Sequence, residues 1–189
     1  MGKVIVQQFV TLDGVMQAPG DPGEFEHGGW QKPYVCEDHL TYIVQQANEA
    51  EALLLGRKTY EGFAAAWPSA AGMRGLADRM NAMPKYVVSS TLTHAAWNAA
   101  LIHGDVADEV AKLKKQLTGD LLVVGSRRLT QTLMEHHLVD EYRIWVHPVV
   151  LGSGERLFLE GGRPFSLDLA SVQSTSAGAV ILTYRSKMS

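Results

Sequence analysis

The sequence is poor in cysteine, and it has no long apolar run and no strong excess of charge of one sign. Its 189 residues include one cysteine, Cys36, so an intrachain disulfide and a cysteine-based zinc site are both excluded. The 17 basic and 20 acidic side chains give a net charge of −3, which argues against nucleic acid as a partner. No stretch reaches the roughly 18 consecutive apolar residues of a transmembrane helix, so we expect no membrane partner.

Other features that would change the interpretation are also missing. The first residues lack the apolar stretch and small-residue cleavage site of a secretory signal, which together with the single thiol predicts a cytoplasmic protein. There is no internal repeat, no low-complexity tract and no linker rich in proline, glycine or serine. A chain of this length has enough residues for a full hydrophobic core, so we predict one domain over residues 1–189.

Strand-like and helix-like segments alternate over the first two thirds of the chain. Apolar residues recur at helical spacing, for example at Leu40, Ile43, Val44 and Ala47, and short apolar runs lie between such segments. The predicted helices contain residues 40–47, 60–67, 73–80, 106–117 and 129–134, the last with Ser126 as its N-cap. The predicted strands are residues 4–10, 52–56, 86–88, 121–124, 142–150, 165–172 and 179–185.

This order of segments predicts an α/β fold of three layers. Fully apolar strands that alternate with helices are typical of a mostly parallel central sheet with helices on both faces. The last three strands follow one another without helices, so we expect them to add an antiparallel edge. Residues 17–33, rich in proline and glycine, form a long loop that we interpret as a lid.

Three predicted turns at the carboxyl ends of strands carry groups that bind phosphate. Gly56-Arg57-Lys58-Thr59 combines a helix start with two cations and a hydroxyl, and Gly125-Ser126-Arg127-Arg128 combines a helix start with two guanidinium groups. Ser89-Ser90-Thr91 offers three hydroxyls. Ligands of open α/β sheets bind at this edge, so the turns together indicate a nucleotide with several phosphates.

Each turn also has a purely structural interpretation. A glycine with an arginine at a strand–helix junction is often a turn beside a solvated cation, and Ser126 is a common type of helix cap. Neither G-x-G-x-x-G nor G-x-x-x-x-G-K-[ST] occurs in the sequence, so a conventional Rossmann or P-loop site is not supported.

Asp13 and His147 are the candidate catalytic residues. Asp13 follows the first strand, where its carboxylate would hydrogen-bond a polar heterocycle or simply close an Asp-Gly turn on its own backbone. His147 ends a later strand and is either a proton donor or a polar group bonded to a loop.

Four further residues are candidates for the substrate side. Phe25 and Trp30, on the long loop, would stack on a planar substrate or else close the loop over the core. Gly152 and Gly154 would let a substrate approach the backbone, or they form a bend. The adjacent His136 and His137 point in different directions at a helix end, so we predict no metal site.

Five motifs, in this order along nearly the whole chain, resemble the dihydrofolate reductase-like superfamily. The similarity is greatest to its branch related to the C-terminal reductase domain of the bifunctional deaminase-reductase of riboflavin biosynthesis. The motifs are Thr11-Leu12-Asp13-Gly14-Val15, Leu55-Gly56-Arg57-Lys58-Thr59-Tyr60-Glu61, Lys85-Tyr86-Val87-Val88-Ser89-Ser90, Val124-Gly125-Ser126-Arg127-Arg128-Leu129 and Pro148-Val149-Val150-Leu151-Gly152-Ser153-Gly154.

The resemblance implies an NADPH-dependent reductase, commonly a homodimer, that passes a hydride to a small polar heterocycle. A pyrimidine of the riboflavin pathway or a pterin-like molecule is the implied substrate. Arg57, Lys58 and Thr59 would contact cofactor phosphates, Ser89 and Ser90 the 2′-phosphate side, and residues 125–128 the pyrophosphate. Val15 or Met16 would approach the nicotinamide.

The sequence departs from the pattern of the family at two points, and the first of them keeps a second interpretation open. The carboxylate that binds pterin in dihydrofolate reductases has no clear counterpart, since Glu37 and Asp38 equally fit first-turn charges of a helix. The deaminase zinc motif H-x-E…P-C-x-x-C is absent. The alternative is a non-catalytic nucleotide-binding or regulatory dimer on the same fold, because a fold does not determine function.

Overall fold

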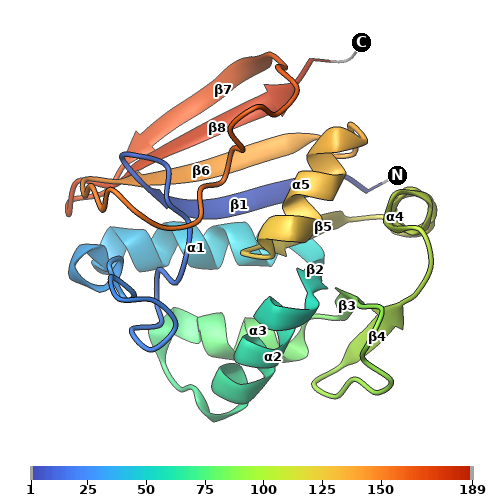
Figure 1. Ribbon diagram of the computed structural model, residues 1–189. Helices are drawn as coiled ribbons and strands as arrows, with labels where there is room; N and C mark the ends of the chain where they lie inside the picture. Colours follow the sequence, from blue (N-terminus) through green and yellow to red (C-terminus); the bar gives the residue numbers. More distant parts are fainter. Residues whose placement is uncertain (1, 188–189) are drawn as a thin grey trace. The chain divides into compact units, whose positions relative to one another are not determined.

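The computed structural model describes residues 2–187. Hydrogen bonding places eight strands in the order β4-β3-β2-β5-β1-β6-β8-β7 (Figure 1). The strands are β1 (Val4–Thr11), β2 (Ala50–Gly56), β3 (Lys85–Val88), β4 (Ala99–Ile102), β5 (Asp120–Val124), β6 (Glu141–His147), β7 (Leu167–Ser174) and β8 (Val180–Ser186). The helices are α1 (Glu37–Glu49), α2 (Arg57–Ala66), α3 (Leu76–Ala82), α4 (Val106–Gln116) and α5 (Arg127–Glu135), with 3-10 turns η1 (Lys32–Tyr34), η2 (Trp67–Ser69) and η3 (Met73–Gly75).

The chain divides into two compact units, and β1 and α1 contribute to both. Unit 1 comprises residues 2–6 and 40–140, and unit 2 comprises residues 7–39 and 141–187. The predicted single domain over residues 1–189 stays a prediction, and the two units are described separately below.

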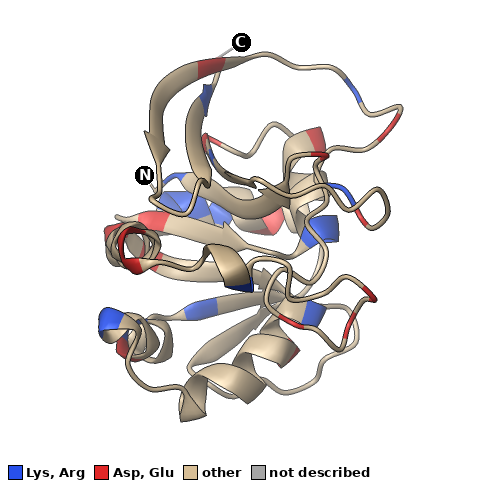
Figure 2. Ribbon diagram, turned by 90° about the vertical axis from the view of Figure 1, so that its left-hand side faces the viewer, with Lys and Arg blue, Asp and Glu red and all other residues tan. Residues whose placement is uncertain are grey.

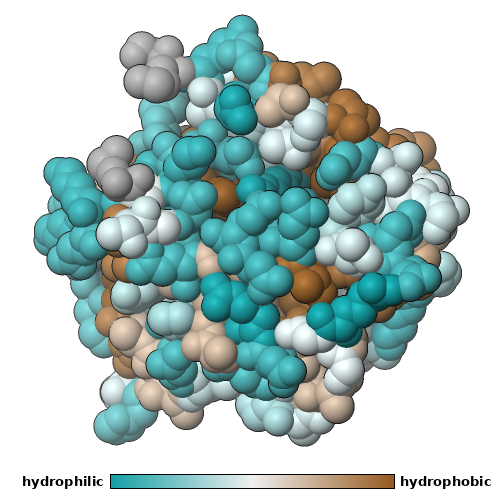
Figure 3. Space-filling model, turned by 180° about the vertical axis from the view of Figure 1, so that it is seen from behind, coloured by the Kyte–Doolittle hydropathy of each residue, from teal (hydrophilic) through white to brown (hydrophobic). Residues whose placement is uncertain are grey.

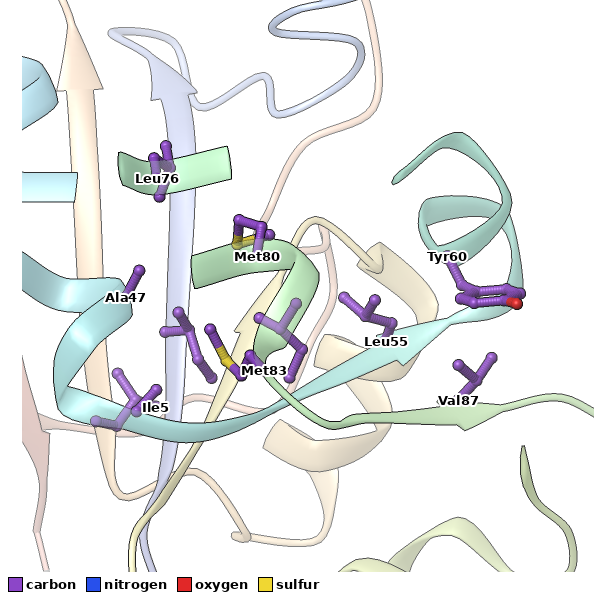
Figure 4. Close-up of a cluster of buried hydrophobic side chains, with 11 residues drawn as sticks. Ile5, Ala47, Leu55, Tyr60, Leu76, Met80, Met83 and Val87 are labelled. Carbon is purple, nitrogen blue, oxygen red and sulfur yellow. The ribbon is translucent and has the colours of Figure 1, made fainter. Parts of the chain in front are cut away.

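Unit 1 is the parallel part of the fold. Strand β2 pairs in parallel with β3 on one side and with β5 on the other, and β3 pairs in parallel with β4. Leu53 and Leu55 of β2 face a buried cluster with side chains of α1, α2 and α3 (Figure 4). Leu54 lies between them in the strand and therefore points to the other face, and α5 contacts β2. The predicted parallel sheet with helices on both faces is confirmed in this unit.

Unit 2 contains the antiparallel part. Strand β8 pairs antiparallel with β6 and with β7, as predicted for the C-terminal strands. The segment between β1 and α1 has no helix or strand except the short turn η1, so the predicted long loop is also confirmed.

One strand was missed, and two local predictions were wrong. Strand β4 was not predicted. The helix predicted from Met73 starts only at Leu76, because residues 72–75 all have φ between 52° and 83°, which an α-helix cannot contain. Ser126 precedes α5, but its side chain makes no cap hydrogen bond.

Candidate functional site

The three turns predicted to bind phosphate follow neighbouring strands of unit 1. Because β3, β2 and β5 are adjacent and parallel, their carboxyl ends lie at one edge of the sheet. Ser89 follows β3, Arg57 follows β2 and Gly125 follows β5. The structure therefore brings together all ten residues that the sequence nominated for cofactor phosphates: Gly56, Arg57, Lys58, Thr59, Ser89, Ser90, Gly125, Ser126, Arg127 and Arg128.

Direct hydrogen bonds join the turn after β2 to the turn after β5. The Ser126 amide donates to Thr59 Oγ1 at 2.9 Å, and the Gly56 amide donates to Ser126 Oγ at 2.9 Å. Gly125 and Ser126 have φ values of 58° and 54°, so both adopt the left-handed conformation. A Cβ atom on Gly125 would lie 3.1 Å from Thr59 Oγ1, which explains why glycine is needed at this position.

These bonds account for the wrong prediction about Ser126. Its hydroxyl accepts from Gly56 and donates to the Val124 carbonyl oxygen at 3.1 Å, so it is not available to cap α5. Helix α2 likewise begins without a side-chain cap, whereas Asp105 caps α4 by accepting from the Asp108 amide at 3.0 Å. The two helices that start at this edge thus present N-terminal amides without a capping side chain, and such amides attract anions.

Arg57 reaches from α2 to the turn after β3. Its Nη1 donates to Thr91 Oγ1 at 2.7 Å, and its Nε donates to Glu61 Oε1 at 3.0 Å. Ser89 Oγ accepts from the amides of Thr91 and Leu92 at 3.2 and 3.0 Å, so this buried hydroxyl shapes the turn. Ser90 and Thr91 are exposed. Thr91 thus joins the site as the hydroxyl beside the guanidinium.

Sequence reasoning missed one group near this turn. His103 follows the unpredicted strand β4, and its Nδ1 lies 3.1 Å from the Ser89 carbonyl oxygen. No local signal indicated this contact, because β4 is defined by its pairing with β3. A cavity of about 330 Å³ beside Lys85 and Trp97 lies at the amino end of β3, at the opposite end of the strand from Ser89.

The donor set at this edge fits a ligand with several phosphates. Arg57, Lys58 and Arg128 are exposed cations, Arg127 is half-buried, and the hydroxyls and uncapped helix amides surround them. Guanidinium groups and helix N-terminal amides are the donors that bind phosphate oxygens in proteins. The residues present are therefore chemically suited to the phosphates of a dinucleotide.

In unit 2, Asp13 connects two turns. Its carboxylate accepts from Thr11 Oγ1 at 2.6 Å, from the Gly152 amide at 2.9 Å and from the Leu151 amide at 3.3 Å. These bonds, the one from Thr11 above all, lower the pKa of Asp13 below its ordinary value. Asp13 is therefore ionised at neutral pH and holds the turn after β1 against residues 151 and 152.

We expect Asp13→Ala to destabilise this part of the protein. The substitution removes the acceptor of two amides and one hydroxyl, and because these donors are partly exposed and can bond to water, the loss is about 0.5–1.5 kcal/mol of the free energy of unfolding. Urea unfolding of the variant beside Asp13→Asn, which keeps the volume and one acceptor oxygen, measures the loss. An unfolding midpoint equal to that of the wild type in both variants would contradict the assigned role.

Val15, Met16, Phe25 and Gly154 lie together in the same unit. Val15 pairs with Arg156 in an isolated bridge, and the Met16 amide donates to the Glu155 carbonyl oxygen at 2.8 Å. A Cβ atom on Gly154 would lie 2.7 Å from Val15 Cγ1 and 3.1 Å from Phe25 Cζ. Val15 and Met16 are buried, and Gly154 permits the close approach.

Trp30, His39 and His147 are buried and form an aromatic cluster with the half-buried Tyr34. Trp30 Nε1 donates to the Gln17 carbonyl oxygen at 2.8 Å, and its ring packs edge-on to His147 at 5.2 Å between centroids. The hydroxyl of Tyr34 donates to the Pro148 carbonyl oxygen at 3.2 Å, which ties the long loop to the end of β6. His39, which sequence reasoning left out, lies 6.0 Å from His147 between ring centroids.

The environment of His147 disfavours a role as proton donor. Its side chain is fully buried, and Nδ1 lies 3.0 and 3.3 Å from the carbonyl oxygens of Trp145 and Val10. Two acceptors at Nδ1 assign the proton to that nitrogen. Burial lowers the pKa of His147, so the ring is neutral at physiological pH.

The comparison with protein families identifies the fold family. The model of the RibD C-terminal domain matches residues 2–181. The chain belongs to this family. Its fold is that of the dihydrofolate reductase-like superfamily, as predicted from the five motifs.

The chain is also similar to three individual proteins. The chain is 29% identical over 185 residues to the uncharacterised protein YyaP of Bacillus subtilis (strain 168), covering 96% of this chain and 94% of YyaP. A protein provisionally assigned to riboflavin biosynthesis, from Shewanella sp. PV-4, matches with a TM-score of 0.78 at 21% identity, over 98% of this chain and 99% of that one. Dihydrofolate reductase from Enterococcus faecalis, in complex with NADP(H) and RAB-propyl, matches with a TM-score of 0.65 at 14% identity, over 99% and 98%.

The part of the chain that the structure describes was searched for metal-binding clusters and for membrane-spanning helices, and neither was found. Residues 2–187 contain no group of three or more histidine, cysteine, aspartate or glutamate side chains placed to hold a metal ion. Within the same residues, every helix is too short or too polar to cross a membrane.

Proposed function

We propose that the protein is an NADPH-dependent reductase that passes a hydride to a small polar heterocycle, either a pyrimidine of the riboflavin pathway or a pterin-like molecule. Family membership supports a reductase-type function. The observation that carries the proposal is the coupling of three phosphate-binding turns at one sheet edge, through Arg57–Thr91 and Thr59–Ser126. A cytoplasmic location is part of the proposal.

Each group of residues has a distinct part in the proposed reaction. Arg57, Lys58, Ser90 and Thr91 bind the 2′-phosphate side, and Gly125 to Arg128 bind the pyrophosphate through helix amides and guanidinium groups. NADPH, when bound, supplies the hydride. Ser89 shapes its turn, and Ser126 and Thr59 hold the two turns in register.

The substrate side of the proposal lies in unit 2. The residues proposed for the substrate are Phe25, Trp30, Gly152 and Gly154. Asp13 orients the turn beside them through its bonds to the Leu151 and Gly152 amides. Because His147 is neutral and buried, water rather than His147 supplies the proton that accompanies the hydride.

The proposal predicts tight, 2′-phosphate-dependent binding of NADPH. Titration with NADPH and with NADH, followed by nicotinamide fluorescence, should show a clear preference for NADPH. Arg57→Ala should weaken NADPH binding by about 10- to 150-fold, because a charge-assisted hydrogen bond contributes about 1.5–3 kcal/mol. The loss for NADH should be much smaller.

Arg163→Ala is a matched control, since Arg163 is an exposed arginine in unit 2, outside the phosphate-binding turns. It should bind NADPH like the wild type. Failure of the wild type to bind either nucleotide would reject the reductase proposal, and equal losses in the two variants would reject the role of Arg57.

A second candidate is a non-catalytic nucleotide-binding or regulatory protein. It is favoured by one observation: both candidate catalytic side chains, Asp13 and His147, bond to groups of the chain itself. Cofactor oxidation in the presence of pterins and ribitylaminopyrimidines separates the two functions. NADPH binding without turnover of any of these would favour the second.

A further inference from the structure

Three parallel strands of unit 1 end at the same level of the sheet, and His103 directly follows one of them. The pairing of β2 with β3 and of β3 with β4 aligns the last residues of all three strands with one another. The next residues along the chain are Arg57 after β2, Ser89 after β3 and His103 after β4. Because neighbouring strands lie about 4.8 Å apart, the backbones of Arg57 and His103 lie about 10 Å apart, on opposite sides of the turn after β3.

Side chains bond to the turn after β3 from both sides. On the β4 side, Nδ1 of His103 lies 3.1 Å from the Ser89 carbonyl oxygen, and on the β2 side Arg57 Nη1 donates to Thr91 Oγ1 at 2.7 Å. A carbonyl oxygen only accepts, so Nδ1 of His103 carries a proton, and Nε2 is the nitrogen that remains for a ligand. His103 is exposed, as are Ser90 and Thr91, so a ligand at this turn has access to the ring.

The position of His103, rather than its exposure, points to a function. Hydrophilic residues cover much of the face seen in Figure 3, and His94 and His136 are exposed as well. His103 has its ring fixed by a hydrogen bond at the sheet edge where the three phosphate-binding turns end. Basic and acidic residues are interspersed along the ribbon in Figure 2, so attraction of an anion to this edge depends on the few donors located there.

The charged groups around this turn come from α2 and α4. The Arg57 guanidinium of α2 pairs with a glutamate of its own helix at 3.0 Å. At the start of α4, the Asp105 carboxylate accepts from a backbone amide of the helix, and Glu109 pairs with a lysine of the helix at 2.7 Å. These charges are already engaged within their own helices. A phosphate that binds at the turn is therefore the main change in charge that His103 experiences.

We propose that His103 is a proton-dependent contact for the 2′-phosphate of the nucleotide, so that binding of NADPH takes up a proton from solvent at Nε2. This inference rests on the proposed function and adds a regulation by pH to the same site. In the neutral ring, Nε2 carries a lone pair that repels phosphate oxygens. In the protonated ring both nitrogens are donors, so Nε2 donates to the phosphate while Nδ1 keeps its bond to Ser89. Histidine changes its charge between pH 5 and 8, so the contact varies within the physiological range.

The test is the affinity for NADPH and for NADH between pH 8 and pH 6, in the wild type and in His103→Asn. Asparagine keeps a side-chain amide that donates to the Ser89 carbonyl oxygen, but it takes up no proton. As the pH falls, the NADPH affinity of the wild type should rise about 3- to 5-fold relative to the variant, as expected for one contact between exposed charges. The phosphate itself gains a proton near pH 6, and the ratio of the two proteins cancels this effect. The same ratio for NADH, which lacks the 2′-phosphate, should stay constant.

Proton uptake gives a second readout that a purely structural role of His103 would not change. Calorimetric titration with NADPH at pH 7, in buffers of different ionisation enthalpy, should show more protons taken up by the wild type than by His103→Asn. His136→Asn is the matched control, because His136 is an exposed histidine at the far end of α5 from the turn after β5. It should behave like the wild type in both measurements.

The outcomes separate this inference from the reductase proposal. If the wild type prefers NADPH but the ratio to His103→Asn does not change with pH, the inference is overturned and the reductase proposal stands. Equal losses of NADPH and NADH affinity in His103→Asn at every pH would also overturn it, because His103 would then only shape the turn. If the wild type binds neither nucleotide, both proposals fail.

Discussion

Gly125→Val is expected to abolish measurable NADPH binding, with a loss of affinity of at least about 100-fold. The reason is geometric. Gly125 has φ = 58°, a conformation that costs a residue with a side chain about 1–2 kcal/mol, and a Cβ atom would lie 3.1 Å from Thr59 Oγ1 and 3.2 Å from Thr59 Cγ2. To relieve this overlap, the turn after β5 must move away from Thr59. Ser126 then loses its bonds to Thr59 and Gly56, and the first amides of α5 lose their position.

Gly72→Val is the control that separates displacement of the turn after β5 from the backbone strain of a side chain at positive φ. Gly72 also has a positive φ of 80°, but a Cβ atom there meets nothing within 4 Å. We expect both variants to lose about 1–3 kcal/mol of the free energy of unfolding, and only Gly125→Val to lose NADPH binding. Isothermal titration calorimetry on both variants, with urea unfolding, makes the comparison. If Gly125→Val binds NADPH like the wild type, the turn after β5 is not part of a cofactor site.

The sequence predicted most elements of unit 1 because each is defined by local spacing. The buried runs and helical periods around Leu53, Tyr60 and Leu122 are recognisable within short windows, and the strand–turn–helix units follow from them. Strand β4 has no such signal. Its residues 99–102 include two alanines, and the strand exists because β3 offers a parallel partner.

In the candidate site, the individual hydrogen bonds likewise could not be predicted from local sequence patterns. The three turns were recognisable because each combines a strand end, small residues and hydroxyls or cations within four positions. The bonds that join them link residues 67 and 70 positions apart, Thr59 with Ser126 and Gly56 with Ser126. Local sequence alone favours a helix-capping role for a serine that precedes a helix. Because Ser126 bonds instead to Gly56 and Thr59, which are distant in the sequence, it does not cap the helix. Likewise, no spacing rule indicated that His39 and His147 lie together.

The buried histidines should make the protein sensitive to mild acid. His39 and His147 are 2% and 0% exposed, and the part of the chain that the structure describes offers no hydrogen-bond partner to His39 Nδ1 or His147 Nε2. Burial, and next the nearby His147, lower the pKa of His39 to about 4, although the charge of Asp38 acts in the opposite direction. Burial lowers the pKa of His147 as well.

The sign of the pH dependence follows from whether the folded or the unfolded chain binds more protons. The unfolded chain takes up a proton on each histidine near the ordinary pKa of about 6.5, while the folded chain resists protonation of His39 down to about 4. Between these values the unfolded state binds more protons, so stability falls as the pH falls from about 6.5 to about 4. The pKa values of Asp13 and Asp38 are lowered in the folded chain. Their contributions to the free energy of unfolding are therefore lost only below about pH 4, and they do not affect the comparison between pH 7 and pH 5.

Replacing His39 by glutamine should remove much of this sensitivity. We expect the wild type to lose on the order of 2 kcal/mol more free energy of unfolding between pH 7 and pH 5 than His39→Gln does, because glutamine takes up no proton. The comparison uses each protein's own difference between the two pH values, so a lower overall stability of the variant does not affect it. His94→Gln, at an exposed histidine, should behave like the wild type. An equal loss in wild type and His39→Gln would show that protonation of other groups controls acid unfolding.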